Sequence, residues 1–448
     1  MKTQFSSAWA LLFTLALLFS CAEPMEQSLT NKKEALLAQR ELQTKAINDQ
    51  LSKGITQSDV EKYLDVRMNI SHNLIESINR HSIGEDVYVF IVNLIDGRWF
   101  IISGDYSSSP VIAEGEAGGF RVSQRPSRHE IALFESIRNY IIENRTSNYD
   151  SAKSQGNRME WVQMQKIYDL KKKKEAIRDM DPDTSEVESV IIIDTLINQY
   201  YPHLTSTTWH QFAPFNNAAP LATSSEKCPV GCFVTAIAQL LYYTHYEFGF
   251  PNDIYAGASC NSYYNQQPYI YNFSNPTSTT WDSMNPSWYY IDDDDPYTAA
   301  LCALISYRSG TYYGFDIYGY YGATPSSNIP STLSSFYLTG VSQQSFSSSS
   351  IMNEIRNDRP VLCDGYPDSD FINGHAYLID GYKWLSVQHI EVVTDLSGNI
   401  LEQNIIATYS DFKWGINSGG DGFFLGYLSE GSYYAYGRHI YTGWSQNQ

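Results

Sequence analysis

The sequence predicts an α+β protein in which a small domain with an antiparallel sheet precedes a larger domain. Residues 86–103 alternate apolar and polar positions around Asp96-Gly97, which is typical of a β-hairpin. Residues 232–246 carry a long helical pattern. With 43% apolar residues and 14% aromatic residues, including 35 Tyr, the chain can bury a proper core, and this composition argues against disorder.

The charge of the chain is unevenly distributed. The net charge of −19 argues against nucleic acid as the main partner. After residue 190 there are 7 Lys and Arg against 22 Asp and Glu, a net of −15, whereas the first 190 residues carry a net of −4. The acidic part either favours basic substrates or forms a solvated surface.

Residues 1–21 have the features of a targeting segment. Lys2 precedes an apolar run over residues 9–19, which is too short for a comfortable transmembrane helix. Leu18-Phe19-Ser20-Cys21 resembles a bacterial lipobox, in which Cys21 would carry the lipid; because Phe19 is bulky, cleavage by an ordinary signal peptidase stays an alternative. We therefore expect an exported protein, either secreted or a lipoprotein of the outer membrane or cell surface.

Five cysteines follow the targeting segment, and five is an odd number for an exported chain. At least one thiol is therefore free unless it pairs with another molecule. No second Cys or His pair stands at ligand spacing near Cys228 and Cys232, so we predict no metal site and no cofactor.

Along the chain, residues 22–82 are polar and helix-prone. The hairpin over 86–103 is continued into a small sheet by residues 110–113, and residues 127–146 look helical. Residues 151–189 are charged and poor in apolar residues, and we interpret them as an exposed linker with a protease-sensitive joint at Lys171 to Lys174. The predicted domains are therefore residues 22–150 and 190–448, and the larger one contains one strong helix among loops and strands.

Cys232 opens that helix, directly after Pro229 and Gly231. A thiol at a helix N-terminus feels the positive end of the helix dipole, which lowers its pKa toward the reactive thiolate. The alternative is that Cys232 is a small hydrophobic residue of the core.

A thiolate nucleophile needs a base, and among the nine His residues His375 has a distinctive context. It follows Gly374, which permits close approach of the backbone, and begins a strand pattern 143 residues after Cys232. This order and separation of Cys and His occurs in papain-like enzymes.

Five blocks resemble the streptopain family of cysteine peptidases, in the same order, over residues 190–448. They are Thr208 to Gln211 with Pro214 to Asn216; Cys228 to Cys232 with Thr235, Ala236, Ala238 and Gln239; Tyr318 to Ala323 with Arg359 to Val361; Gly374 to Ala376 with Asp380 to Tyr382; and Trp414, Gly415 and Asn417 with Asp421 to Phe424. The hairpin that ends in Ile102 to Asp105 resembles the family's propeptide.

The resemblance implies a papain-like fold preceded by an inhibitory propeptide that is cleaved off within residues 151–189. It assigns Cys232 as the nucleophile and His375 as the general base and acid. Gln211 would donate to the oxyanion, and Trp414 would cover the imidazole. The implied function is that of a cysteine endopeptidase made as a zymogen, with proteins or peptides as substrates and its own propeptide as inhibitor.

The chain departs from the family at two positions. Lys413 stands where the family often has the Asn that orients the imidazole, and Ile416 replaces a second Trp. Lys has no acceptor, so His375 would rely on a backbone carbonyl, on Asp411 or on Asn417. Lys413 also favours the alternative of a catalytically inactive surface lipoprotein that binds peptides or host proteins. A further alternative is acyl transfer to amines.

Overall fold

The computed structural model describes residues 54–122, 128–146, 156–158, 160–162, 164–165, 167–169, 188–249, 259–264, 267–272, 279–286, 295–316, 319–366, 374–394, 400–417, 422–425 and 436–446. The described residues from Thr56 onward belong to one compact unit. The predicted targeting segment, residues 22–53 and the Lys171 to Lys174 joint lie outside the described residues.

The first described helix and strand only partly follow the prediction for residues 22–82. Helix α3 (Gln57–Arg67) begins at a capping box, in which Thr56 and Asp59 bond each other's backbone N–H. Residues 72–83 are not helical: a short 3₁₀ turn (His72–Leu74) leads into strand β1 (Ile75–Ile83), which pairs with β2. Because β1 is half exposed, it lacks the apolar alternation that reveals a strand.

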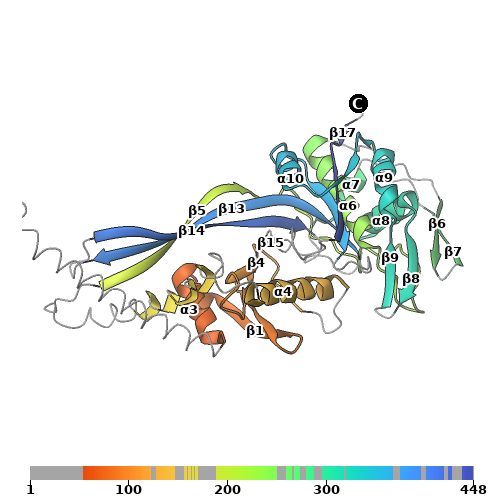
Figure 1. The fold of residues 1–448 in the computed structure, drawn as a ribbon. Helices are drawn as coiled ribbons and strands as arrows, with labels where there is room; N and C mark the ends of the chain where they lie inside the picture. The colour runs from red at the N-terminus through yellow and green to blue at the C-terminus, as the bar shows by residue number, and fades with distance from the viewer. Residues whose placement is uncertain are drawn as a thin grey trace, which may run out of the picture. The chain divides into compact units, whose positions relative to one another are not determined.

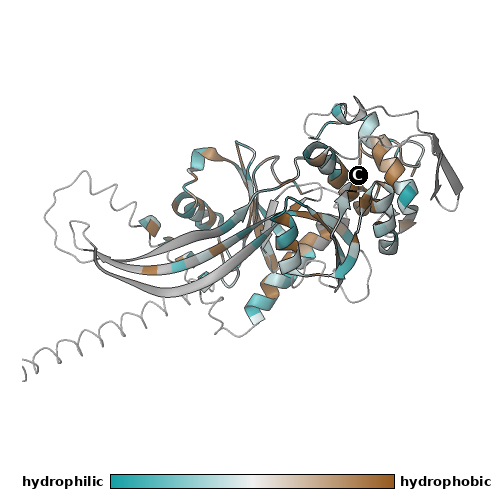
Figure 2. Ribbon diagram, turned by 90° about the horizontal axis from the view of Figure 1, so that it is seen from above, coloured by the Kyte–Doolittle hydropathy of each residue, from teal (hydrophilic) through white to brown (hydrophobic). Residues whose placement is uncertain are grey.

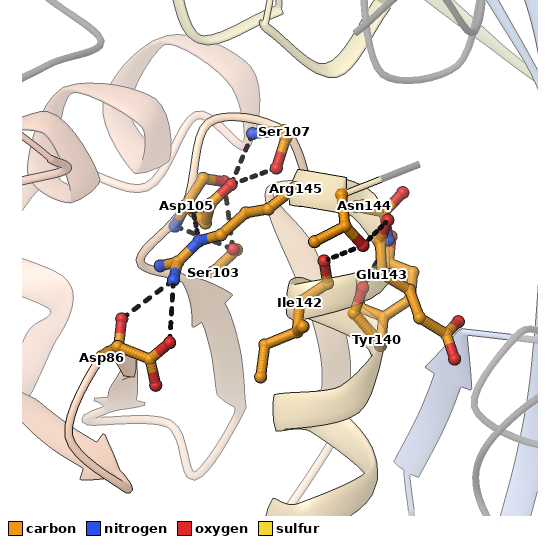
Figure 3. A network of polar contacts seen from close by, with 10 residues as sticks. Asp86, Ser103, Asp105, Ser107, Tyr140, Ile142, Glu143, Asn144 and Arg145 are labelled. Atoms are coloured by element: carbon orange, nitrogen blue, oxygen red, sulfur yellow. Dashed lines mark hydrogen bonds and ion pairs between the residues drawn. The ribbon is translucent and has the colours of Figure 1, made fainter. Parts of the chain in front are cut away.

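The predicted hairpin, the small sheet and the helix after it are confirmed. They are β2 (Val87–Leu94), β3 (Trp99–Ser103), β4 (Val111–Gly115) and α4 (Arg128–Thr146). Arg145, in the last turn of α4, reaches back to this sheet. Its Nε lies 2.5 Å from Asp105 Oδ2, and its Nη1 donates to the backbone oxygen of Asp86 at 3.0 Å (Figure 3).

The interpretation of residues 151–189 as an exposed linker is wrong for the helical residues described within 156–169. Trp161 and Met164 are buried, and the Tyr63 hydroxyl of α3 donates to Glu160 Oε1 at 3.0 Å. Trp161, Val162 and Met164 are buried apolar residues in a segment that is otherwise largely polar, so average composition did not reveal them.

The largest sheet of the described part runs in the order β1-β2-β3-β4-β15-β14-β13-β12-β16-β11, and β5 pairs with β13 in addition (Figure 1). The further strands are β5 (Glu188–Tyr201), β11 (Ser342–Ser345), β12 (Val361–Tyr366), β13 (His375–Thr394), β14 (Ile400–Asn417), β15 (Gly422–Leu425) and β16 (Tyr436–Thr442). Strand β15 pairs with β4 through Phe423 and Glu114, so the N-terminal sheet and the C-terminal sheet are continuous.

Both faces of β12 and β13 are buried, because alternate residues contribute to two different hydrophobic clusters. Leu362, Ala376 and Leu378 pack with helix α6 (Cys232–Phe248). The intervening residues Cys363, Tyr377 and Ile379 belong to a second cluster, which also contains residues of β2, β3 and α4. The N-terminal sheet therefore shares a core with the C-terminal sheet.

The predicted helix α6 is confirmed. In the described part of the larger domain, further helices that were not predicted are α7 (Thr279–Asp282), α8 (Pro296–Ser309), α9 (Ile329–Ser335) and α10 (Ser348–Ile355). In Figure 2 the helices around the C-terminus carry hydrophobic residues, in brown, beside hydrophilic ones, in teal. Helix α8 had recognisable ends. Asp295 caps it by accepting from Thr298 N–H at 3.0 Å, Pro296 follows, and Gly310 ends it at φ +66°.

Two smaller sheets complete the described fold. Strands β6 (Ser259–Tyr264), β7 (Gln267–Asn272), β8 (Tyr312–Asp316) and β9 (Gly319–Ala323) form one, and β10 (Leu338–Thr339) pairs with β17 (Ser445–Gln446). A second 3₁₀ turn covers Ser326–Asn328. The predicted α+β class is confirmed. Among the described residues, no helix has both the length and the apolar character needed to cross a membrane.

Candidate active site

Cys232 is the first residue of α6, and its side chain is half-buried. The turn before it needs glycine twice. Gly231 has φ +96°, and a Cβ on it would lie 2.6 Å from the backbone oxygen of Gly322 in β9. A Cβ on Gly322 would in turn lie 2.6 Å from the oxygen of Pro229. Two backbones therefore touch directly at the start of the helix, and this contact fixes the position of Cys232.

Gly231→Ala is expected to lower the free energy of unfolding by about 2–4 kcal/mol, because it adds both backbone strain and a clash with the chain at Gly322. Peptide hydrolysis should fall as well, because the start of α6 must shift. Gly249→Ala is the matched control: it has φ +71° but no atom within 4 Å of the added Cβ. Chemical denaturation of both variants measures the difference, and equal losses would contradict a role for the close contact.

His375 is the first residue of β13, opposite Gly365 of β12, and only 7% of it is exposed. Its ring lies 6.3 Å from that of Tyr377 and nearly parallel to it. The preceding Gly374 leaves room for Tyr366, since a Cβ there would lie 2.7 Å from the tyrosine ring. The imidazole is thus buried at the start of a strand, beside the Tyr377 ring.

The structure brings the start of α6 against the start of β13. Ala376, which directly follows His375, packs in the same hydrophobic cluster as α6, and its backbone N–H is among the groups that lower the pKa of Cys232. The residues predicted as nucleophile and base therefore lie on adjoining element ends.

The pKa of Cys232 differs from the sequence-based expectation. Burial raises the pKa of the thiol to about 11, and the charge of Asp364 adds to the rise, while the backbone N–H groups of Ala376 and Phe233 oppose it. The helix N-terminus acts in the predicted direction, but loss of water around the sulfur outweighs it. In this state of the chain the thiol is neutral near pH 7.

The segment of Gln211 is tied to the turn before Cys232. The Gln211 backbone oxygen accepts from Val230 N–H at 3.0 Å, and Asn216 donates from Nδ2 to the oxygen of Cys228 at 3.1 Å. Burial lowers the pKa of His210, beside Gln211, to about 4, so this imidazole is neutral near pH 7. Gln211, half-buried, therefore lies on a segment fixed against the cysteine turn.

Asp380 connects the histidine strand to the Gln211 segment. It is part of the predicted histidine motif, but no role was predicted for it. It is fully buried in β13, accepts from Thr205 N–H at 3.0 Å and lies 2.7 Å from His203 Nδ1. Its backbone oxygen accepts from Leu204 N–H at 3.0 Å. The signal in the sequence was an acidic residue that directly follows an apolar strand pattern and precedes Gly381.

Lys413 and Trp414 are not brought to His375. Lys413 lies opposite Lys383 in the β13–β14 register, and Trp414 lies opposite Tyr382. His375 is eight residues before Lys383, about 26 Å along an extended strand at roughly 3.3 Å per residue. The side chains of Asp411 and Asn417 lie outside the described residues.

Lys413 instead has a partner from the N-terminal sheet. Only 5% of it is exposed, and its Nζ lies 3.5 Å from Glu114 Oε2 on β4. Lys383 Nζ donates to Glu114 Oε1 at 3.0 Å. Burial disfavours the charge of Glu114, but the two ammonium groups outweigh this and hold its pKa below its usual range. Glu114 was missed because nothing in its local sequence marks it.

The other described thiols are less suited to nucleophilic chemistry. Cys228, Cys302 and Cys363 are buried, and burial raises the pKa of each. Within the residues that the structure covers, no three His, Cys, Asp or Glu side chains are grouped so that they could hold a metal ion. A half-buried cysteine at a helix start, packed against a strand that begins with histidine, is an arrangement typical of cysteine peptidases.

The family comparison agrees with this class. The model of the peptidase C10 family matches residues 209–423, which include Gln211, Cys232 and His375. Over these residues the chain is similar to the peptidase C10 family, the streptopain family, and this match supports a cysteine-type peptidase.

Two solved structures from Prevotella intermedia are similar to this chain. A fragment of prointerpain A, a mutant, is 16% identical with a TM-score of 0.49 and covers 83% of this chain and 100% of its own. Active wild-type interpain A cysteine protease is 21% identical with a TM-score of 0.39 and covers 55% of this chain and 95% of its own. The comparison with curated proteins found no match.

Proposed function

We propose that this chain is the zymogen of an exported cysteine endopeptidase, in which Cys232 is the nucleophile and His375 the general base and acid. The observation that carries the proposal is the contact between the start of α6 and Ala376, the residue after His375. It supports the pairing of Cys232 with His375, because both residues lie at adjoining element ends and nucleophilic catalysis requires a base near the thiol.

Hydrolysis would proceed through an acyl-enzyme. The Cys232 sulfur, after losing its proton to His375, attacks the peptide carbonyl carbon, and the carbonyl oxygen becomes an oxyanion. Protonated His375 then gives its proton to the leaving amine as the C–N bond breaks. Water, deprotonated by His375, attacks the resulting thioester and releases the acid and the free thiol.

Gln211 is proposed to stabilise the oxyanion with its side-chain amide, together with the backbone N–H of Cys232. Each such donor is worth on the order of 3 kcal/mol in the transition state. The bond between the Gln211 oxygen and Val230 N–H supports this role, because it holds the amide-bearing residue beside the cysteine turn. Since Trp414 lies opposite Tyr382, we do not extend the proposal to a cover of the imidazole by Trp414.

The N-terminal sheet is proposed to be the propeptide. Three features support its attachment to the peptidase part: the pairing of β4 with β15, the shared hydrophobic cluster, and the bonds of Glu114 to Lys383 and Lys413. The raised pKa of Cys232 fits a latent state, because the thiolate is scarce near neutral pH. Cleavage within 151–189, followed by release, would give the mature enzyme.

Export is proposed from the sequence of residues 1–21, with a lipid anchor at Cys21 or full secretion as its two forms.

The inactive-lipoprotein alternative rested on Lys413. Since Lys413 pairs with Glu114 and lies far along the strand from His375, no structural observation favours that alternative.

The test is the intact mass of the chain before and after activation, with and without a thiol-reactive epoxide inhibitor. The activated chain is expected to gain one inhibitor mass, which peptide mapping assigns to Cys232, and the mass lost on activation gives the cleavage point. Labelling of another cysteine, or none in an active preparation, would contradict the proposal. An added amine separates hydrolysis from acyl transfer by its products.

A further inference from the structure

A second pair of an acid and a histidine lies beside Cys232. Asp364, in β12, is 5% exposed. Its Oδ1 accepts from the backbone N–H of His439 at 3.0 Å and lies 3.0 Å from His439 Nδ1, and its Oδ2 accepts from the Tyr441 hydroxyl at 3.2 Å. Both partners come from β16, the last strand of the large sheet in chain order, so the C-terminal strand satisfies this buried carboxylate.

The strand register places this carboxylate next to the active-site elements. Asp364 lies directly opposite Ala376 on β13 and opposite His439 on β16. Ala376 packs in the same hydrophobic cluster as the start of α6, and the Tyr441 ring packs edge-on against Phe233, the second residue of α6, at 6.2 Å. Little more than the backbone of one strand, β13 at Ala376, therefore separates Asp364 from the Cys232 thiol.

The charge of Asp364 acts on the thiol. It is among the causes that raise the pKa of Cys232, because a nearby carboxylate disfavours a thiolate. Burial also raises the pKa of Asp364 itself, and His439 and Tyr441 oppose this rise. His439 is the basic side chain in contact with Asp364 in the described part of the chain, at the distance of an ion pair when it is protonated.

The titratable and charged groups around Asp364 come from each neighbouring element. They are His439, Tyr441 and Arg438 on β16, Tyr366 and Cys363 on β12, Cys232 on α6, His375 on β13 and Tyr312 on β8. The hydroxyls and thiols of this set are neutral near pH 7 unless Cys232 ionises, and Arg438 keeps a constant charge. Histidine is the residue type in this set whose charge ordinarily changes near neutral pH, and His439 is the histidine in contact with Asp364.

We propose that His439 is a positioning residue for the reaction: it holds Asp364 through Nδ1 and, when protonated, offsets the carboxylate charge behind Cys232, so that the thiolate forms at lower pH. This rests on Cys232 as the reactive thiol of the proposed function. His439 is 36% exposed, so its proton exchanges freely with solvent. The pair would make the nucleophile more reactive in mildly acidic surroundings than its buried site alone allows.

The test is the second-order rate of Cys232 alkylation by iodoacetamide in the full chain from pH 6 to pH 9, read by peptide mass mapping. His439→Gln should slow alkylation at pH 6 by about threefold to fivefold. The loss of the positive charge should raise the pKa of the Cys232 thiol by about one unit and so lower the thiolate fraction. The higher nucleophilicity of the more basic thiolate partly offsets this loss. The ratio to the parent chain should fall toward one at pH 9, because an imidazole side chain is ordinarily neutral there.

Two further variants separate charge from structure. In an Asp364→Asn background His439→Gln should have no effect, and Asp364→Asn alone should be at least as fast as the parent at every pH. Tyr441→Phe is the matched control, because it removes a neutral bond to the same carboxylate and should leave the pH dependence unchanged.

Three outcomes would overturn the proposal: a His439→Gln ratio that is constant with pH, no effect of His439→Gln, or an effect that persists without the Asp364 charge. If His439→Gln does not fold, Asp364→Asn decides alone, since alkylation at pH 9 that is slower than in the parent is incompatible with the proposal. Alkylation reports on the thiol whether or not the chain hydrolyses peptides, so failure here is distinct from failure of the proposed function.

Discussion

Cys232→Ala is expected to abolish peptide hydrolysis, with a loss of at least about 10³-fold in kcat/KM, because it removes the proposed nucleophile. Labelling by the epoxide inhibitor should vanish in the same variant. The fold should persist, because Cys232 is half-buried and alanine fits the first turn of α6. Hydrolysis of a peptide with a fluorescent leaving group, with circular dichroism as a check on folding, measures both effects.

Cys302→Ala is the matched control for that variant. Cys302 is 2% exposed in α8 and its pKa is raised by burial, so it is a thiol of the core without access to substrate. Its removal should lower stability slightly and leave hydrolysis and labelling intact. If hydrolysis continued in Cys232→Ala, or if Cys302→Ala removed it, the assignment of the nucleophile would have to be abandoned.

Glu114→Gln is expected to have the largest effect on stability. It leaves the buried Lys413 ammonium, and Lys383 opposite it, without their carboxylate. Loss of one partner from a buried ion pair costs about 3–5 kcal/mol, and two facing like charges add to the loss. Full-chain Glu114→Gln should therefore have a lower Tm in calorimetry, and its N-terminal sheet should be cleaved and released faster during activation.

The effect of Glu114→Gln should depend on pH in a defined direction. The pKa of Glu114 is lowered, so its contribution to stability is present above its ordinary pKa of 4.5 and is lost as the pH falls through the lowered value. The difference between parent and variant should therefore be full at pH 7 and shrink in acid. A difference that grows below pH 4.5 would contradict the ion pair as its cause.

Glu116→Gln is the matched control. Glu116 is exposed, two residues from Glu114, and accepts only from the Tyr200 hydroxyl at 3.2 Å among the bonds found for its side chain. Its loss should change stability by less than about 0.5 kcal/mol. Equal destabilisation by both variants would mean that the lysine contacts contribute little.

The sequence by itself determined the elements whose signals are local. The alternation around Asp96-Gly97 predicts β2 and β3, and the pattern from Cys232 onward predicts α6. The ordered motif blocks pointed to the C10 family, because such motifs record short-range requirements for a thiol, an imidazole and an amide. Failures at this level were also local: β1 lacks alternation, and the end signals of α8 were overlooked beside its uniformly apolar face.

The tertiary structure alone decided which charged residues meet. Lys413 looked like a disturbance to His375, but the register of β13 and β14 moves it away from the imidazole and against Glu114. That carboxylate also bonds Lys383, 269 residues away along the chain. Likewise Asp364 reaches His439 only because β16 returns beside β12. Periodicity and motifs report on neighbours in sequence, whereas the partner of a buried charge is chosen by strand pairing between distant segments.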